Sequence, residues 1–176
     1  MLELLLTLVV IGLIISLAGL SVSSGRRSYE VDAALRNFAD IAEYALDEAQ
    51  LSGRDMGLLI EKRSEGGATI FSAQWLQRNG PDWQPTPYDE DAYGRQDFPL
   101  SVEVALEVEQ DQADVNGGEN ADEEDARPQV IFYSSGETTP GIMTWLDDTS
   151  GDILWEMEWD LLGRISLRKK GLADEE

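Results

Sequence analysis

The chain has 176 residues, with 35 acidic and 13 basic side chains and a formal net charge of −22. It contains neither cysteine nor histidine, which excludes disulfides, thiolate chemistry, Cys/His zinc sites and Ser-His-Asp or Cys-His catalysis. An acidic surface repels phosphate backbones, so we expect no nucleic-acid partner. We also expect no cofactor, no bound metal and no catalytic residue.

The first 22 residues contain a single charge, Glu3. A helix of that length measures roughly 33 Å, enough to cross a hydrocarbon core of about 30 Å. We predict a permanent membrane anchor rather than a cleaved signal, because no basic region precedes the apolar run. Arg26 and Arg27 follow it, and the positive-inside rule taken alone would place the next domain in the cytoplasm.

Glu3 allows two interpretations. At the very end of the helix, its carboxylate can simply reach the membrane interface. In the other interpretation, further residues and a basic leader precede Met1 in the protein. Glu3 then lies deeper in the membrane and needs a cationic partner, such as the terminal amine of a neighbouring subunit.

Beyond the apolar run, hydrophobic residues recur at spacings of three and four, which predicts that the helix continues with one apolar face. Ser52-Gly53 is the predicted end, with the glycine as C-cap. We predict three parts: a transmembrane or assembly half of the helix (1–25), an amphipathic half (26–53) and a β-rich domain (54–176). The residues predicted to face a sheet are Val31, Leu35, Phe38, Ala42, Ala45 and Ala49.

After Gly53 the hydrophobic period changes to two, which indicates β-strands. Residues 56–62 and 68–75 form a predicted hairpin, and the proline-rich segment 79–98 is interpreted as a long irregular connection. Further strands are predicted at 100–108, 129–134, 142–146, 152–159 and 165–168. In the fourth of these, Ile153, Trp155, Met157 and Trp159 are expected to face one way.

Residues 111–127 form a polar, acidic run with a Gly-Gly pair, which is typical of a mobile, disordered surface loop. Asp114, Asn116 and Glu119 carry oxygen ligands of the kind that calcium prefers. Their order does not fit the EF-hand pattern, so calcium binding here is the minor interpretation. Tryptophans that share a strand face are typical of a core, or otherwise of a carbohydrate-stacking platform.

These elements predict an α+β fold, in which the stripe of the long N-terminal helix covers a face of a C-terminal antiparallel β-sandwich. Residues 2–13, LELLLTLVVIGL, resemble the prepilin-type N-terminal motif, with Glu3 at the position of that family's glutamate. The leader, the cleavage glycine and the first mature residues of that motif are absent. Leader cleavage and N-methylation, which the family undergoes, are therefore assigned to no residue.

The downstream chain is similar to minor pseudopilins of the type II secretion system, specifically the H class. The similar segments are 38–53, 57–60 (GLLI), 130–137 (VIFYSSGE) and 161–165 (LLGRI). The resemblance implies a pilin-like subunit in the inner membrane, with a single span and its globular domain in the periplasm. It would lie at or near the tip of a pseudopilus that pushes folded proteins through the outer membrane.

The resemblance also implies partners: other major and minor pseudopilins, the inner-membrane assembly platform, and the prepilin peptidase if a leader lies upstream. Glu3 would set axial register by neutralising the terminal amine of an adjacent subunit. Three alternatives stay open. They are a minor pilin of a type IV pilus, which should expose a basic tract such as 164–170, a membrane-anchored carbohydrate-binding module, and a paired-carboxylate glycosidase.

Overall fold

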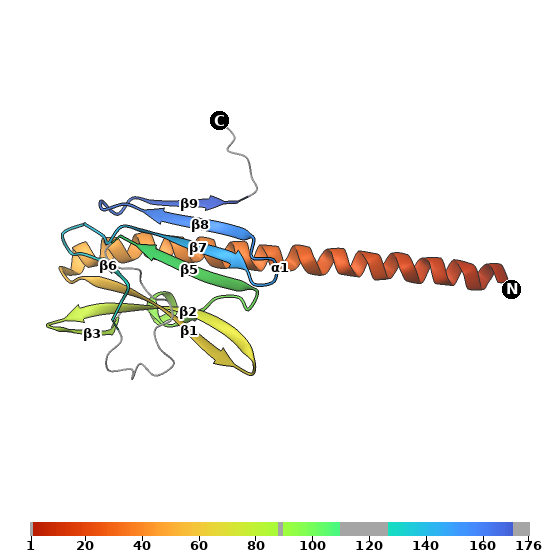
Figure 1. The fold of residues 1–176 in the computed structure, drawn as a ribbon, viewed down its shortest axis with the longest axis horizontal. Coiled ribbons are helices and arrows are strands. Elements are labelled where there is room, and N and C mark those ends of the chain that lie inside the picture. The colour runs from red at the N-terminus through yellow and green to blue at the C-terminus, as the bar shows by residue number, and fades with distance from the viewer. Residues whose placement is uncertain (1, 88–89, 110–126, 171–176) are drawn as a thin grey trace, which may run out of the picture. The chain divides into compact units, whose positions relative to one another are not determined.

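The computed structural model describes residues 2–87, 90–109 and 127–170 (Figure 1). The first helix, α1, runs from Leu2 to Ser52 and ends beside Gly53, where the C-cap was predicted. The chain forms two compact units, Met1–Ala34 and Leu35–Glu176, so α1 contributes to both. The predicted division at residues 25 and 53 separates the apolar, amphipathic and β-rich parts of the chain rather than compact units. It stays a prediction.

The second unit contains two antiparallel sheets, which Figure 1 shows as separate layers of strands. Sheet A has the order β3-β2-β1-β6, with β4 also pairing with β2, and sheet B has the order β5-β7-β8-β9. The bounds in sheet A are β1 Met56–Glu65, β2 Ala68–Asn79, β3 Asp82–Pro85, β4 Gln96–Asp97 and β6 Val130–Phe132. Those in sheet B are β5 Val102–Val108, β7 Gly141–Asp147, β8 Ile153–Trp159 and β9 Ile165–Lys169.

The predicted α+β class with antiparallel strands is confirmed, and so is the hairpin formed by β1 and β2. Its register runs from Met56 opposite Gln77 to Glu65 opposite Ala68, so both strands are longer than predicted. The two-residue turn is Gly66-Gly67, with φ of 60° and 85°. Two successive positive φ angles match the right-handed twist of a hairpin, and glycine adopts them without steric cost.

The interpretation of residues 79–98 as an irregular connection is wrong. This segment contains β3, the short helix α2 (Glu90–Tyr93) and β4, and both strands pair with β2. Proline is the reason that the pattern was missed, because it lacks an N–H donor and is confined to strand edges. Pro85 stands at the last position of β3, the outermost strand of sheet A.

The expectation that Ile153 shares the buried face of β8 is also wrong. Trp155, Met157 and Trp159 are buried, whereas Ile153 is exposed. The register between β7 and β8 shifts next to Trp145 and Leu146, opposite the start of β8. A bulge adds one residue to a strand and so ends the simple alternation of its side chains.

The core of the second unit takes side chains from α1 and from both sheets. Phe38 lies at its centre, with ring centroids 6.2 Å from Trp75 of β2 and 5.7 Å from Trp145 of β7. Phe98, which follows β4, lies 5.4 Å from Phe38 and 6.1 Å from Trp145. One helix residue thus joins the two sheets, while their stacking as a β-sandwich stays a prediction.

No helix in the described parts of the chain combines the length and hydropathy of a membrane span. The acidic run 111–127 lies outside the described residues apart from Arg127.

Candidate functional site

Glu3 lies in the first turn of α1 and is exposed. The hydroxyl of Thr7 donates a hydrogen bond to its backbone carbonyl at 3.1 Å. A carboxylate in a first helical turn interacts favourably with the helix dipole, which is a local role that needs no partner. Among the described ion pairs none includes Glu3, and Val9, Val10 and Ile11 nearby are about half exposed. This end of α1 therefore presents apolar surface and one carboxylate.

The residues predicted to face a sheet are all buried: Val31 in the first unit, and Leu35, Phe38, Ala42 and Ala45 in the second, followed by Ala49. Small alanines beyond Phe38 allow the helix backbone to approach the sheets closely, while the ring of Phe38 reaches into both. On the neighbouring face, the Arg36 guanidinium carbon lies 4.9 Å from the ring centroid of Trp155, a cation–π contact.

Sequence reasoning missed a second feature of α1, a groove of about 610 Å³ between the helix and residues 92–93. Ile41, Tyr44 and Leu51 line it together with Asp47 and Glu48. The signal was present in the sequence, because these apolar residues lie on one helical face adjacent to the predicted stripe. That face looked like ordinary solvent-exposed surface, because charged residues interrupt it.

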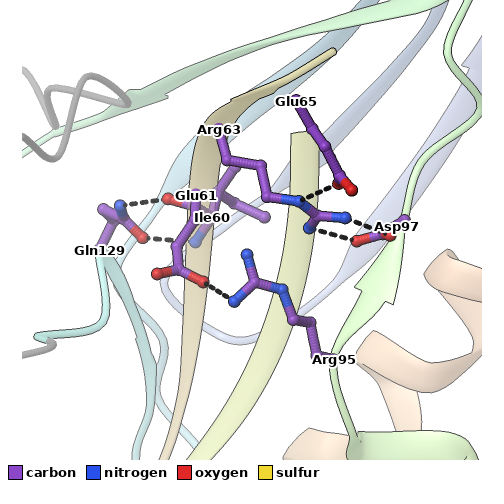
Figure 2. Close-up of polar contacts among 7 residues, drawn as sticks. All are labelled: Ile60, Glu61, Arg63, Glu65, Arg95, Asp97 and Gln129. Carbon is purple, nitrogen blue, oxygen red and sulfur yellow. Dashed lines mark hydrogen bonds and ion pairs between the residues drawn. The ribbon is translucent and has the colours of Figure 1, made fainter. Parts of the chain in front are cut away.

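Sequence reasoning also missed the polar side-chain contacts that attach distant segments to β1 of sheet A (Figure 2). The Gln129 side chain accepts a hydrogen bond from the Ile60 N–H at 2.8 Å and donates one to the Ile60 carbonyl at 2.9 Å. It thereby imitates one residue of a neighbouring strand, directly beyond the point where β6 stops pairing with β1. This contact spans 69 residues of sequence, so no local pattern announces it.

Arg63 of β1 forms a bidentate pair with Asp97 of β4, with N–O distances of 2.8 and 2.7 Å (Figure 2). The hydrogen bond from Arg63 and its charge lower the pKa of Asp97, and the same hydrogen bond raises the pKa of Arg63. Beside them, Arg95 lies 3.1 Å from Glu61. These ion pairs connect strands and present no open reaction site.

The carbohydrate-binding alternative does not fit the structure. A carbohydrate platform requires adjacent exposed tryptophans, but Trp75, Trp145, Trp155 and Trp159 are all buried, and only Trp83 is partly exposed. Trp83 is moreover covered by the Arg78 guanidinium, 4.8 Å from the ring centroid.

Two of the four basic residues in the tract 164–170 form ion pairs. Arg164 pairs with Asp160 at 2.8 Å, and Arg168 pairs with both Glu156 and Glu158. The backbone N–H and guanidinium of Arg164 lower the pKa of Asp160, which keeps this pair charged. These ion pairs reduce the positive charge that the tract offers to a phosphate backbone.

No group of three or more acidic side chains placed to hold a metal ion occurs in the described part of the chain. The calcium candidates Asp114, Asn116 and Glu119 lie outside it. Among the described residues, we take the start of α1 and its groove as the candidate functional surfaces.

Comparison with known proteins agrees with this arrangement. The family model described as "Type II transport protein GspH" matches residues 34–163, more than half of the chain. Over 184 aligned residues, the chain is 29% identical to "Type II secretion system protein H" of Aeromonas hydrophila, covering 100% of this chain and 93% of that protein.

Solved structures share the fold. A crystal structure of the minor pseudopilin EpsH of Vibrio cholerae matches with a TM-score of 0.63 at 24% identity, covering 84% of this chain and 99% of that one. The solution structure of E. coli GspH matches with a TM-score of 0.57 at 16% identity, covering 81% and 90%.

Proposed function

The chain belongs to the GspH family of type II transport proteins, and we propose that it is a minor pseudopilin at or near the tip of the type II secretion pseudopilus. The family match over residues 34–163 carries this proposal. The role is structural rather than enzymatic: the subunit joins a helical assembly that drives folded proteins through the outer membrane. Its partners are other pseudopilins and the inner-membrane assembly platform, with the prepilin peptidase acting on any leader.

We assign the apolar run at residues 1–22 to a single span of the inner membrane and the globular domain to the periplasm. Support comes from the charge distribution, because the run contains only Glu3 while all other acidic residues follow Tyr29. A helix of that kind can leave the bilayer only if similar helices cover its apolar surface, as happens in a filament. In this proposal the two sheets form the sandwich that covers the part of the helix outside the membrane.

Glu3 sets axial register in this proposal, by pairing with the terminal amine of an adjacent subunit. Its exposure within the single chain supports an intermolecular partner, although the helix dipole alone also favours an acid there. The intermolecular role predicts that loss of the carboxylate changes assembly, whereas the dipole role predicts only a small change in stability.

The experiment is secretion and pseudopilus incorporation with Glu3→Ala in cells that lack the wild-type subunit. We expect a folded domain, impaired incorporation and reduced secretion. Glu43→Ala is the matched control, since Glu43 is an exposed acid on the same helix outside the groove lining. Secretion at the wild-type level with Glu3→Ala would remove the assigned role of Glu3, and secretion that does not need the chain at all would contradict the proposed function.

A further inference from the structure

The groove beside α1 has an apolar floor and a partly apolar rim. Ile41 and Tyr93 are 6% and 9% exposed and form the floor, whereas Tyr44 and Leu51 are 65% and 84% exposed. Large apolar side chains that are this exposed and line one concave surface mark an interaction site more often than isolated ones do. The groove lies wholly in the second unit, so the parts that form it belong together.

The helical wall of the groove has the spacing of a coiled-coil seam. Asn37, Ile41, Tyr44, Glu48 and Leu51 follow one another at intervals of four, three, four and three residues. The spacing is that of a heptad seam, with apolar side chains at Ile41, Tyr44 and Leu51 and polar ones at the other two positions. The wall extends over roughly 21 Å at 1.5 Å per residue, which suits three to four turns of a partner helix.

The charge of the groove selects the partner further. Asp47 and Glu48 line it, and among the residues that the structure describes no basic side chain does. Within the described residues, no ion pair neutralises either carboxylate. The whole chain has a net charge of −22, so an acidic partner would be repelled both locally and at long range.

We propose that this groove is the docking site for an amphipathic helix of a partner subunit, with apolar residues at heptad spacing flanked by arginine or lysine. The proposal rests on the proposed function as an assembly subunit and adds the surface and the chemistry of one contact. Tyr44 and Leu51 supply the apolar contact, and Asp47 and Glu48 pair with the basic flanks.

The test measures binding of two synthetic peptides to the full-length chain in detergent by isothermal titration calorimetry. Both peptides have about three heptads with leucine at the seam, and they differ only in flanking residues, arginine in one and glutamate in the other. We expect the arginine peptide to bind and the glutamate peptide not to bind. Tyr44→Ala with Leu51→Ala should weaken the arginine peptide by about tenfold or more.

Two matched controls distinguish binding in the groove from nonspecific hydrophobic binding and from nonspecific electrostatic attraction. Leu161→Ala with Leu162→Ala removes two exposed leucines elsewhere, 53% and 63% exposed, and should change affinity by less than about twofold. Asp47→Asn with Glu48→Gln should weaken binding more than Glu103→Gln with Glu107→Gln, which removes two exposed acids of β5. Because the replaced groove residues Tyr44 and Leu51 are exposed, thermal melting should show that these variants remain folded.

Equal binding of the two peptides, or equal losses in groove and control variants, would overturn the proposal. A dimer of the chain alone that is lost with Tyr44→Ala and Leu51→Ala, seen by analytical ultracentrifugation, would assign the groove to a second copy and also overturn it. If the groove variants bind normally while secretion still depends on Glu3, the docking site is wrong and the proposed function stands.

Discussion

The two sheets of the globular unit are built in different ways. Sheet B is a set of strands with long ladders, seven paired residues for β5 with β7 and five for β8 with β9, and with one register shift between β7 and β8. In sheet A only the β1–β2 hairpin is long, and β6 and β4 add three and two paired residues. Sheet A is completed by side chains from distant segments, such as Gln129 on Ile60 and Asp97 on Arg63.

This difference shows how a sheet can depend on backbone ladders or on individual side chains. In sheet B, neighbouring strands pair along ladders of five to seven residues, and the alternation of apolar residues already defines these strands. In sheet A, short strands leave groups of β1 to be satisfied by a polar side chain, which a single substitution can remove. Sheet A should therefore be the more sensitive to point changes on its surface.

The largest effect should come from Phe38→Ala, which removes the ring that joins the sheets. Truncation of a buried phenylalanine costs about 3–5 kcal/mol of unfolding free energy. Because Phe38 contacts both Trp75 and Trp145, amide hydrogen exchange should accelerate in both sheets. Tyr44→Ala, on the exposed face of the same helix, should change the unfolding free energy by less than about 0.5 kcal/mol. Faster exchange in only one sheet would show that Phe38 does not join them.

The next effect concerns the close packing of sheet A. A Cβ added at Gly57 of β1 would lie 2.5 Å from Cγ of Pro128, so Gly57→Ala should cost about 1–3 kcal/mol by overpacking. Pro128→Gly in the same chain should recover part of the loss, because it removes both Cγ and Cβ of Pro128, which would lie 2.5 and 2.6 Å from the added Cβ. The matched position in sheet B is Gly141, where an added Cβ would lie 2.6 Å from the Glu107 backbone carbonyl. No side-chain deletion can relieve that clash, and additive effects at Gly57 and Pro128 would contradict the expected coupling.

The two sheets also differ in how much of them the sequence predicts. The strands of sheet B were found within a few residues, because Val102 to Val108 and Trp155 to Trp159 alternate clearly between buried and exposed. Segment 79–98 was misinterpreted, since its two strands have four and two residues, too short for a period to be recognised. The hydrogen bonds between Gln129 and Ile60 could not be predicted, because a polar residue 69 positions from its partner carries no local signal.

The two surfaces of α1 also differ in how well the sequence predicted them. The buried stripe around Phe38 was predicted because it recurs at helical spacing. The groove was missed because Asp47 and Glu48 interrupt its apolar residues, and because Tyr93 of its floor comes from the segment that was interpreted as irregular.

A third effect is expected at the side-chain contact between Gln129 and β1. Gln129→Ala removes two hydrogen bonds to Ile60 and should cost about 1–3 kcal/mol, since each contributes about 0.5–1.5 kcal/mol. Hydrogen exchange should accelerate at β1 while β7 and β8 keep their protection. Gln84→Ala is the control, because the Gln84 side chain accepts only one exposed hydrogen bond, from Asn79, in the same sheet. Equal losses of unfolding free energy for the two variants, measured by chemical denaturation, would show that the Gln129 contacts contribute no more than one exposed hydrogen bond.

The smallest effect should come from the ion pair of Arg63 with Asp97, whose carboxylate is about half exposed and therefore screened by solvent. The hydrogen bond from Arg63 lowers the pKa of Asp97 below 3.8 in the folded protein. The pair therefore stabilises the fold above about pH 3.8, and this contribution is lost as the pH falls through the lower folded-state pKa. Arg63→Gln should accordingly be less stable than wild type at pH 7, and the two should converge on acidification.

Urea unfolding of both proteins at neutral and acidic pH measures this difference, and high salt should reduce it at neutral pH. Arg168→Gln provides the comparison in sheet B, where the same change removes pairs to Glu156 and Glu158 on an adjacent strand that a full ladder already holds. If side chains rather than ladders complete sheet A, Arg63→Gln should accelerate exchange at β4, which has only two paired residues, while Arg168→Gln leaves β8 and β9 protected. A larger loss of protection in sheet B would reverse the contrast between the two sheets.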